Sequence, residues 1–179
     1  MKVEETKLKG CFIITPAVFE DARGYFFESF NKSKFEALTK TNVDFVQDNQ
    51  SFSTYGTVRG LHMQLGDSAQ AKLVRVLAGE VLDVAVDLRP DSDTYGEWFS
   101  IRLSAENNLQ LYIPRGFAHG FSVLSETAVF AYKCDNYYDK AAEAGIRFDD
   151  ATLNIDWGVP AEAMQLSEKD LELPFLKTK

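Results

Sequence analysis

One of the two histidines in this sequence lies in a polar segment, Val58-Arg59-Gly60-Leu61-His62-Met63-Gln64. Its alternation is typical of a β-strand and would place His62 and Gln64 on one face and Arg59 on the other. Since imidazole titrates near neutral pH, His62 is the best candidate for a general base. The neighbouring glycine would leave room for a ligand. A hydrogen-bonded core histidine is the alternative.

Lys72 and His119 are further candidates. Lys72 shares a predicted strand face with Val74 and Val76. A lysine in an apolar interior costs free energy unless a ligand or a carboxylate meets it. If this face lines a cavity, Lys72 is functional; if it faces outward, Lys72 is merely solvated. His119 precedes Gly120, and a structural role fits it as well as a ligand contact does.

Other polar residues could belong to the same site. Gln47 and Asn49 share one face of a predicted strand that is polar on both faces, which indicates a lined cavity. Three tyrosines could act as acids, as stacking platforms or only in packing; they are Tyr132, Tyr137 and Tyr138. Scattered basic residues could converge on a phosphate or lie on the surface; they are Arg23, Arg59, Lys72, Arg115 and Lys169.

Several classes of function lack support. The net charge of -8 argues against general nucleic-acid binding, which needs a basic surface. Two separate histidines and two separate cysteines do not form the usual metal-binding patterns, so we expect no metal and no cofactor. Walker, GxGxxG and GxSxG motifs are absent from the sequence. The N-terminal segment MKVEETKLKG does not resemble a signal peptide, and no apolar run could span a bilayer.

The number and spacing of the cysteines are typical of a protein in a reducing compartment. Cys11 and Cys134 are far apart in the sequence and are expected to be free thiols in a cytoplasmic protein, although a disulfide is the alternative.

The elements that would position these residues are mostly short strands. We expect strands near residues 11–14, 25–30, 45–53, 58–64, 72–78, 82–88, 98–103, 109–113, 117–124 and 128–134. A capping-box pattern at Ser33–Glu36 predicts a short helix from Lys34 to Thr39, and residues 167–170 are weakly helical. This pattern predicts a single all-β domain over residues 1–179, a jelly-roll barrel or sandwich with a few short helices.

Several segments, in order along nearly the whole chain, resemble the dTDP-4-dehydrorhamnose 3,5-epimerases. Each alone is weak, but together they are specific. They are Asp21-Ala22-Arg23-Gly24 with Phe27-Glu28, Gln47-Asp48-Asn49, Arg59-Gly60-Leu61-His62, Ala69-Gln70-Ala71-Lys72-Leu73-Val74, Asp87-Leu88-Arg89, Ile113-Pro114-Arg115-Gly116-Phe117-Ala118-His119-Gly120-Phe121, Tyr132-Lys133 and Leu166-Ser167-Glu168-Lys169-Asp170.

The resemblance implies a metal-free, homodimeric cupin-type jelly roll that acts as an isomerase in dTDP-rhamnose biosynthesis. Its substrate would be a dTDP-sugar with a ketone at C4, dTDP-4-keto-6-deoxy-D-glucose. The ketone acidifies the protons at C3 and C5, so a base can remove each to give an enolate. Return of a proton from the opposite face inverts the carbon, and inversion of both carbons gives dTDP-4-keto-L-rhamnose. Neither a nucleic acid nor a membrane is an expected partner.

The resemblance also implies roles for individual residues. His62 would be the base, and Asp170 would orient it. Lys72 would bind the substrate and stabilise the enolate oxygen, while Tyr132 would deliver a proton on the other face. The remaining residues would bind substrate; they are Arg23, Glu28, Gln47, Asn49, Arg59, His119, Tyr138, Glu143 and Lys169. Family resemblance further implies that the Arg23 segment comes from the partner subunit.

The sequence departs from the family pattern beside the proposed base. Met63 stands where an aromatic residue is frequent, and Leu65-Gly66-Asp67-Ser68 replaces a loop that is commonly rich in proline. These differences leave the chemistry intact but leave the specificity open, namely whether one or two carbons are inverted and in which sugar. There are three alternatives to the 3,5-epimerase. They are an enzyme that inverts only one carbon, a ketoisomerase of another deoxysugar pathway, and a cupin that binds a sugar nucleotide without catalysis.

Overall fold

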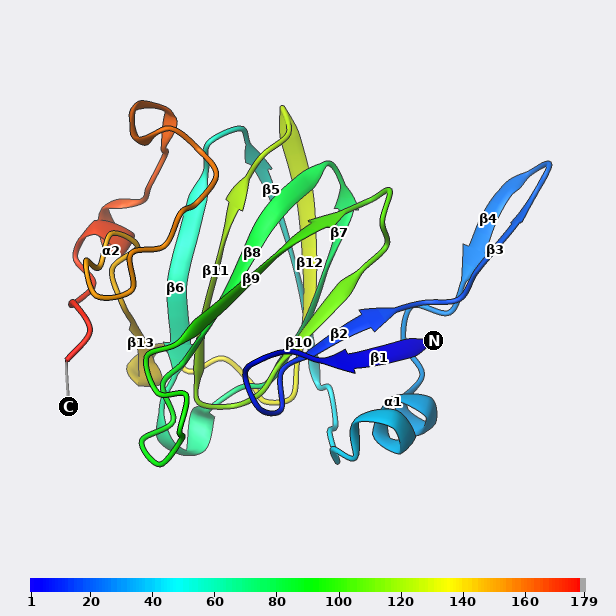
Figure 1. Ribbon diagram of the computed structural model, residues 1–179, viewed down its shortest axis with the longest axis horizontal. Coiled ribbons are helices and arrows are strands. Elements are labelled where there is room, and N and C mark those ends of the chain that lie inside the picture. Colours follow the sequence, from blue (N-terminus) through cyan, green and yellow to red (C-terminus); the bar gives the residue numbers. More distant parts are fainter. Residues whose placement is uncertain (178–179) are drawn as a thin grey trace.

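Two antiparallel sheets face each other in the computed structural model, which describes residues 1–177 (Figure 1). One sheet has six strands in the order β1 (Lys2–Glu5), β2 (Phe12–Thr15), β10 (Gln110–Ile113), β7 (Lys72–Ala78), β12 (Thr127–Cys134) and β5 (Gln47–Thr54). The other has five, in the order β13 (Glu143–Gly145), β6 (Val58–Gln64), β11 (Phe117–Val123), β8 (Glu80–Asp87) and β9 (Trp98–Ser104). This is the predicted all-β jelly roll.

The main core lies between the two sheets. Alternating residues of facing strands fill it, such as Val74 of β7, Ala85 of β8 and Phe130 of β12, all at most 1% exposed. Because alternate residues of a strand point to opposite faces, one apolar set per strand is enough to form this core. Both cysteines, Cys11 and Cys134, are buried free thiols, as predicted.

The longer helix, α1 (Lys32–Thr39), begins two residues before its predicted start. The side chain of Asn31 accepts a hydrogen bond from the backbone N–H of Lys34 and so caps the helix, while Ser33 lies inside it. Asparagine and serine are comparable N-cap residues, so the cap at Asn31 lets the helix begin two residues earlier than the predicted capping box. The second helix, α2 (Glu168–Leu171), is capped by Ser167, within the segment expected to be helical.

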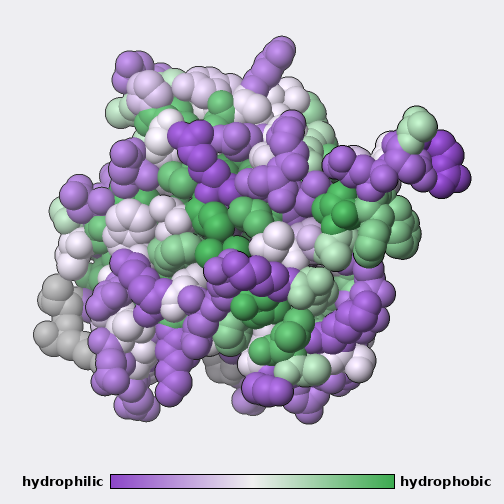
Figure 2. Space-filling view, turned by 45° about the vertical axis from the view of Figure 1, so that its right-hand side comes forward, coloured by the Kyte–Doolittle hydropathy of each residue, from purple (hydrophilic) through white to green (hydrophobic). Residues whose placement is uncertain are grey.

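A two-stranded hairpin projects from the body of the molecule (Figures 1 and 2). It consists of β3 (Val18–Asp21) and β4 (Gly24–Phe27), so the strand expected over residues 25–30 is shorter than predicted. Its aromatic side chains are exposed, with Phe19 at 66% and Phe26 at 71%. An isolated hairpin is at best marginally stable in water, and exposed apolar patches mark interaction surfaces. The hairpin therefore has the properties of a segment that packs against another chain.

Short elements outside the predicted set complete the fold. The strands β1, β3 and β13 were not individually predicted, and three 3₁₀ turns occur at Gly66–Ser68, Lys140–Ala142 and Ala161–Ala163. Among residues 1–177, the structure contains no helix with the length and apolar character needed to cross a membrane.

Candidate active site

Most of the predicted site residues line one cavity of about 440 Å³ between the two sheets. They reach it from both sheets and from the segment after β12, although they are distant in the sequence. The predicted residues that line the cavity are Gln47, Asn49, Arg59, His62, Lys72, His119, Tyr132, Tyr138 and Glu143. The jelly roll thus brings together side chains that the sequence only suggested as separate candidates.

An irregularity in the pairing of β6 with β11 places Arg59 and His62 at the same cavity. His62 pairs with His119, but Arg59 pairs with Phe121, so three steps along β6 match two steps along β11. A β-bulge of this kind shifts the alternation of side chains by one residue. The expectation that Arg59 and His62 lie on opposite faces is therefore wrong.

Gly60 stands at this bulge with φ of +125°, a backbone conformation that favours glycine. A Cβ atom there would lie 2.5 Å from Gly120 Cα and 2.8 Å from the carbonyl oxygen of His119. The space beside Gly60 is thus filled by the neighbouring strand, and the expectation that a ligand occupies it is wrong.

His62 is hydrogen-bonded through Nε2 to Oδ1 of Asp170. Asp170 is almost fully buried on α2, where its backbone N–H is held by the Ser167 side chain. Burial opposes the charged form of Asp170, but hydrogen bonds from His62 and Ser167 leave its pKa below the ordinary value. A carboxylate at Nε2 makes that nitrogen the donor, so Nδ1 of a neutral His62 is free to accept a proton.

Lys72 and Tyr132 extend from the six-stranded sheet, across the cavity from His62. Lys72 lines the cavity, so it does not lie on a solvated outer face. Its burial lowers the pKa of the ammonium group, while negative charge at Cys134, Asp83 and Glu143 would raise it. Burial raises the pKa of the Tyr132 phenol, which therefore keeps its proton at neutral pH. The Lys72 Nζ lies 5.9 Å from the centre of the Tyr132 ring.

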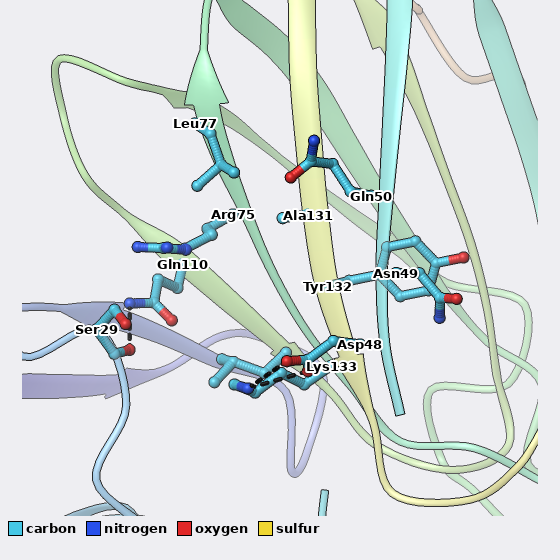
Figure 3. A pocket seen from close by; sticks show the side chains of 11 residues that line it. Ser29, Asp48, Asn49, Gln50, Arg75, Leu77, Gln110, Ala131, Tyr132 and Lys133 are labelled. Carbon is cyan, nitrogen blue, oxygen red and sulfur yellow. Dashed lines mark hydrogen bonds and ion pairs between the residues drawn. The ribbon is translucent and has the colours of Figure 1, made fainter. Parts of the chain in front are cut away.

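Figure 3 shows the side chains of Tyr132 and Asn49 on the side of the six-stranded sheet that faces this cavity. Both side chains extend to the opposite side of their strands from Arg75 and Gln110, which belong to a second pocket on the outer face of the six-stranded sheet. The predicted alternation of the strand containing Gln47 and Asn49 is therefore confirmed.

A hydrogen-bonded cluster borders the mouth of the cavity. Glu143 accepts a hydrogen bond from the Tyr138 hydroxyl at 3.0 Å and pairs with the Lys169 ammonium group. Burial alone would raise the pKa of Glu143, but these two partners lower it. Gln47 donates to Asn49 Oδ1 at 3.1 Å, and its own oxygen accepts from the backbone of Tyr138 at 3.0 Å. The mouth of the cavity thus offers hydrogen-bond donors and acceptors and the exposed ring of Tyr138.

Three predicted residues lie elsewhere in the chain. Arg23 is on the projecting hairpin, paired with Asp21 at 2.6 Å, and its side chain is 90% exposed. Glu28 pairs with Lys34 at 2.8 Å at the start of α1. Arg115 pairs with Asp135, so it does not converge with the other basic residues. Within one chain the basic residues at the cavity are Arg59 and Lys72, with Lys169 beside Glu143.

Some residues at the cavity were not among the predicted site residues. Phe121 and Phe130 form a stacked pair with ring centres 4.3 Å apart, and Gln70 adds an amide. Asp83 lies behind His119 and contacts its Nε2 at 2.8 Å. A single aspartate inside the apolar run Val81–Val86 is a sequence signal that could have identified it, because an isolated buried carboxylate is costly. Residues 1–177 contain no cluster of three or more His, Cys, Asp or Glu suited to a metal ion.

Comparison with known proteins shows which family this chain resembles. The family profile described as dTDP-4-dehydrorhamnose 3,5-epimerase matches residues 5–178. The chain is 52% identical over 171 residues to the dTDP-4-dehydrorhamnose 3,5-epimerase of Shigella flexneri, covering 96% of this chain and 93% of that protein.

Solved structures agree with the sequence comparison. The dTDP-4-dehydrorhamnose 3,5-epimerase of Elizabethkingia anophelis is 60% identical and superposes with a TM-score of 0.95, covering 98% of this chain and 96% of that one. The dTDP-6-deoxy-D-glucose-3,5-epimerase of Legionella pneumophila, solved in complex with dTDP-4-keto-L-rhamnose, is 48% identical with a TM-score of 0.93, covering 97% and 92%. The fold is accordingly the cupin-like jelly roll expected from the sequence.

Proposed function

Because this chain belongs to the dTDP-4-dehydrorhamnose 3,5-epimerase family, we propose that it inverts C3 and C5 of dTDP-4-keto-6-deoxy-D-glucose. It is an isomerase of dTDP-rhamnose biosynthesis, and its product is dTDP-4-keto-L-rhamnose. One observation carries the chemistry: the carboxylate-bound imidazole of His62 faces Tyr132 and Lys72 across the cavity. We further propose that the chain works as one domain in the cytoplasm, without a metal or a cofactor, because proton transfers alone complete the reaction.

The first step is removal of a proton from the carbon next to the ketone. Asp170 holds the Nε2–H of His62, so Nδ1 is the nitrogen that takes this proton. The imidazolium ion that forms is then stabilised by the same carboxylate, as in other carboxylate–histidine pairs. Negative charge develops on the C4 oxygen, and the Lys72 ammonium group neutralises it.

The second step returns a proton from the other side of the sugar. His62 belongs to the five-stranded sheet and Tyr132 to the six-stranded sheet, so the two groups meet the sugar ring from opposite faces. The phenol of Tyr132 carries a proton at neutral pH and delivers it to the carbon. His62 then loses its proton to solvent and Tyr132 regains one, and repetition at the second carbon completes the double inversion.

The rest of the substrate is held by the remaining predicted residues. Arg59, Lys169 and Arg23 supply positive charge for the diphosphate, against the negative charge of the whole chain. Gln47, Asn49, His119, Tyr138, Glu143 and Glu28 bind the sugar and the base by hydrogen bonds or ring contact. Arg23 and Glu28 lie outside the cavity of their own chain, so they serve this role only from a second subunit.

We therefore propose a homodimer in which the projecting hairpin of one subunit reaches the site of the other. The hairpin exposes Phe19, Tyr25 and Phe26. The outer face of the six-stranded sheet offers a pocket of about 310 Å³ that includes Leu77 and Arg75. An exposed apolar arm and a mixed polar and apolar pocket on the same subunit fit an isologous interface, in which each subunit gives and receives the same element.

A subunit-complementation experiment tests this arrangement. A purified heterodimer of one His62→Ala subunit and one Arg23→Ala subunit should recover about half of the wild-type activity, since one of its two sites is complete. The two homodimeric variants are the controls. The His62→Ala homodimer should be nearly inactive, and the Arg23→Ala homodimer should bind the substrate weakly and so be nearly inactive too. If Arg23 acts within its own subunit, the heterodimer contains no complete site and stays as inactive as its parents.

The proposed activity is tested by incubating the protein with dTDP-4-keto-6-deoxy-D-glucose in deuterated water. We expect NMR to show deuterium at both C3 and C5 together with conversion to the L-rhamno product. Deuterium at one carbon alone would identify a mono-epimerase, and migration of the ketone a ketoisomerase. Binding of dTDP without any exchange would show that the protein is a non-catalytic cupin and would refute the enzyme assignment.

A further inference from the structure

Asp83 contains the only buried side-chain oxygen or nitrogen without a hydrogen-bond partner among residues 1–177. Its residue is fully buried on β8. One carboxylate oxygen, Oδ2, binds His119 Nε2 at 2.8 Å, whereas Oδ1 contacts no donor. A buried carboxylate with an unsatisfied oxygen costs folding free energy, so such a group calls for a specific explanation.

Asp87, four residues along the same strand, is a buried aspartate with a structural role and serves for comparison. It is also fully buried, but its oxygens accept hydrogen bonds from Arg89, Ser92 and Thr94. Although burial opposes the charged form, these partners lower its pKa to about 2. Asp83 has one partner where Asp87 has several, so its carboxylate is not placed to maximise stability.

The single partner of Asp83 opens onto the candidate active site. His119 lines the cavity and is itself buried, with its Nε2 toward Asp83. Burial lowers the pKa of His119 despite the neighbouring carboxylate, so the ring is neutral at pH 7. With Nε2–H donated to Asp83, Nδ1 is left as a hydrogen-bond acceptor, and it has no partner among the described residues.

Burial lowers the pKa of Lys72, and Asp83 is among the groups whose negative charge opposes this shift. The ionisable groups that act on Lys72 or line the cavity with it come from five strands and from the segment after β12. They are Asp83, Glu143, Cys134, Tyr132, His119, His62, Arg59 and Tyr138. Burial raises the pKa of Cys134 to about 11 and also raises that of Tyr132, so both are neutral. Glu143 is paired with Lys169. Asp83 is therefore the carboxylate near Lys72 that no cation neutralises.

We propose that Asp83 is a positioning residue of the epimerase, which fixes the Nε2–H form of His119 and supplies the negative charge that keeps Lys72 protonated. This inference rests on the proposed function, in which Lys72 stabilises the enolate oxygen. Because Asp83 does not bind Lys72 directly, the ammonium group stays available to the substrate. The unsatisfied Oδ1 is then the stability cost of placing a negative charge behind the cavity without blocking it.

The test is the Asp83→Asn variant, which keeps an oxygen that can accept from His119 and removes only the charge. We expect kcat for epimerisation to fall roughly 10- to 100-fold. The alkaline limb of the pH profile should move to lower pH by about one unit, because Lys72 then loses its proton more easily. The melting temperature should stay the same or rise, since a neutral amide costs less to bury than a carboxylate.

Asp87→Asn is the matched control, a buried aspartate on the same strand outside the cavity. Its melting temperature should fall by roughly 5 °C while kcat and the pH profile stay at wild-type values. Wild-type kcat in Asp83→Asn, or a loss of kcat without the shift of the alkaline limb, overturns the proposal.

A measurement on the wild-type protein keeps the proposal testable even if Asp83→Asn does not fold. In ¹⁵N NMR of histidine-labelled protein at pH 7, His119 should be neutral with its proton on Nε2. A proton on Nδ1 instead overturns the proposal. This result does not depend on turnover, so it remains distinct from a failure of the proposed function, in which wild-type protein would show no exchange at C3 or C5.

Discussion

Replacing His62 with alanine is expected to reduce deuterium incorporation at both C3 and C5 by roughly 10³-fold or more. The expected loss is the same at the two carbons because one imidazole serves both. His62 has the geometry for this role: Asp170 occupies Nε2, and Nδ1 is left to take a proton. NMR of the substrate in deuterated water measures both rates in one sample.

The control for His62→Ala is its affinity for dTDP, measured by calorimetry. Residues that do not depend on His62 hold the nucleotide, so Kd should stay within about threefold of the wild-type value. Loss of binding and exchange together would mean that the substitution disrupts the cavity. If one carbon still exchanges at the wild-type rate, that carbon uses another base, and His62 has only half of the proposed role.

The strand pattern of this protein could be predicted because short apolar or alternating segments are separated by turns rich in Gly, Asn and Pro. Val58–Gln64 was predicted with its observed bounds, and the strands β7 to β12 lie within a residue or two of their expected positions. The errors occur where a local hydrogen bond or a bulge competes with the pattern. Asn31 caps α1 in place of Ser33, and the bulge beside Gly60 brings Arg59 to the face of His62.

The site itself was less accessible from residue patterns than the fold. Asp170 is 108 residues from His62, and nothing in the spacing of the two predicts their hydrogen bond; only the family resemblance joined them. For Lys72 the sequence left open whether its strand face was inside or outside, and the packing of the two sheets places this face at the cavity. Asp83 could have been noticed as a lone charge in an apolar strand, but its partner His119 is visible only in three dimensions.

The Tyr132→Phe variant, which removes a single oxygen atom, should give the largest difference between the rate of deuterium exchange and the rate of product formation. The ring keeps its packing against Phe130, whose centre lies 6.0 Å away. Burial raises the pKa of the Tyr132 phenol, so the wild-type side chain is a proton donor at neutral pH. Without it, formation of the inverted product should slow by roughly 10²- to 10⁴-fold.

Proton exchange should survive in Tyr132→Phe, because the base is on the other wall of the cavity. His62 can still remove a proton and return deuterium to the same face, which labels the substrate without inverting it. NMR therefore should show deuterated substrate that accumulates ahead of product, the reverse of the wild-type order. Tyr137→Phe is the matched control, since this tyrosine is 67% exposed and should leave both rates unchanged. If inversion continues at the wild-type rate in Tyr132→Phe, the proton comes from another group; if exchange and inversion fall equally, Tyr132 also supports proton removal by His62.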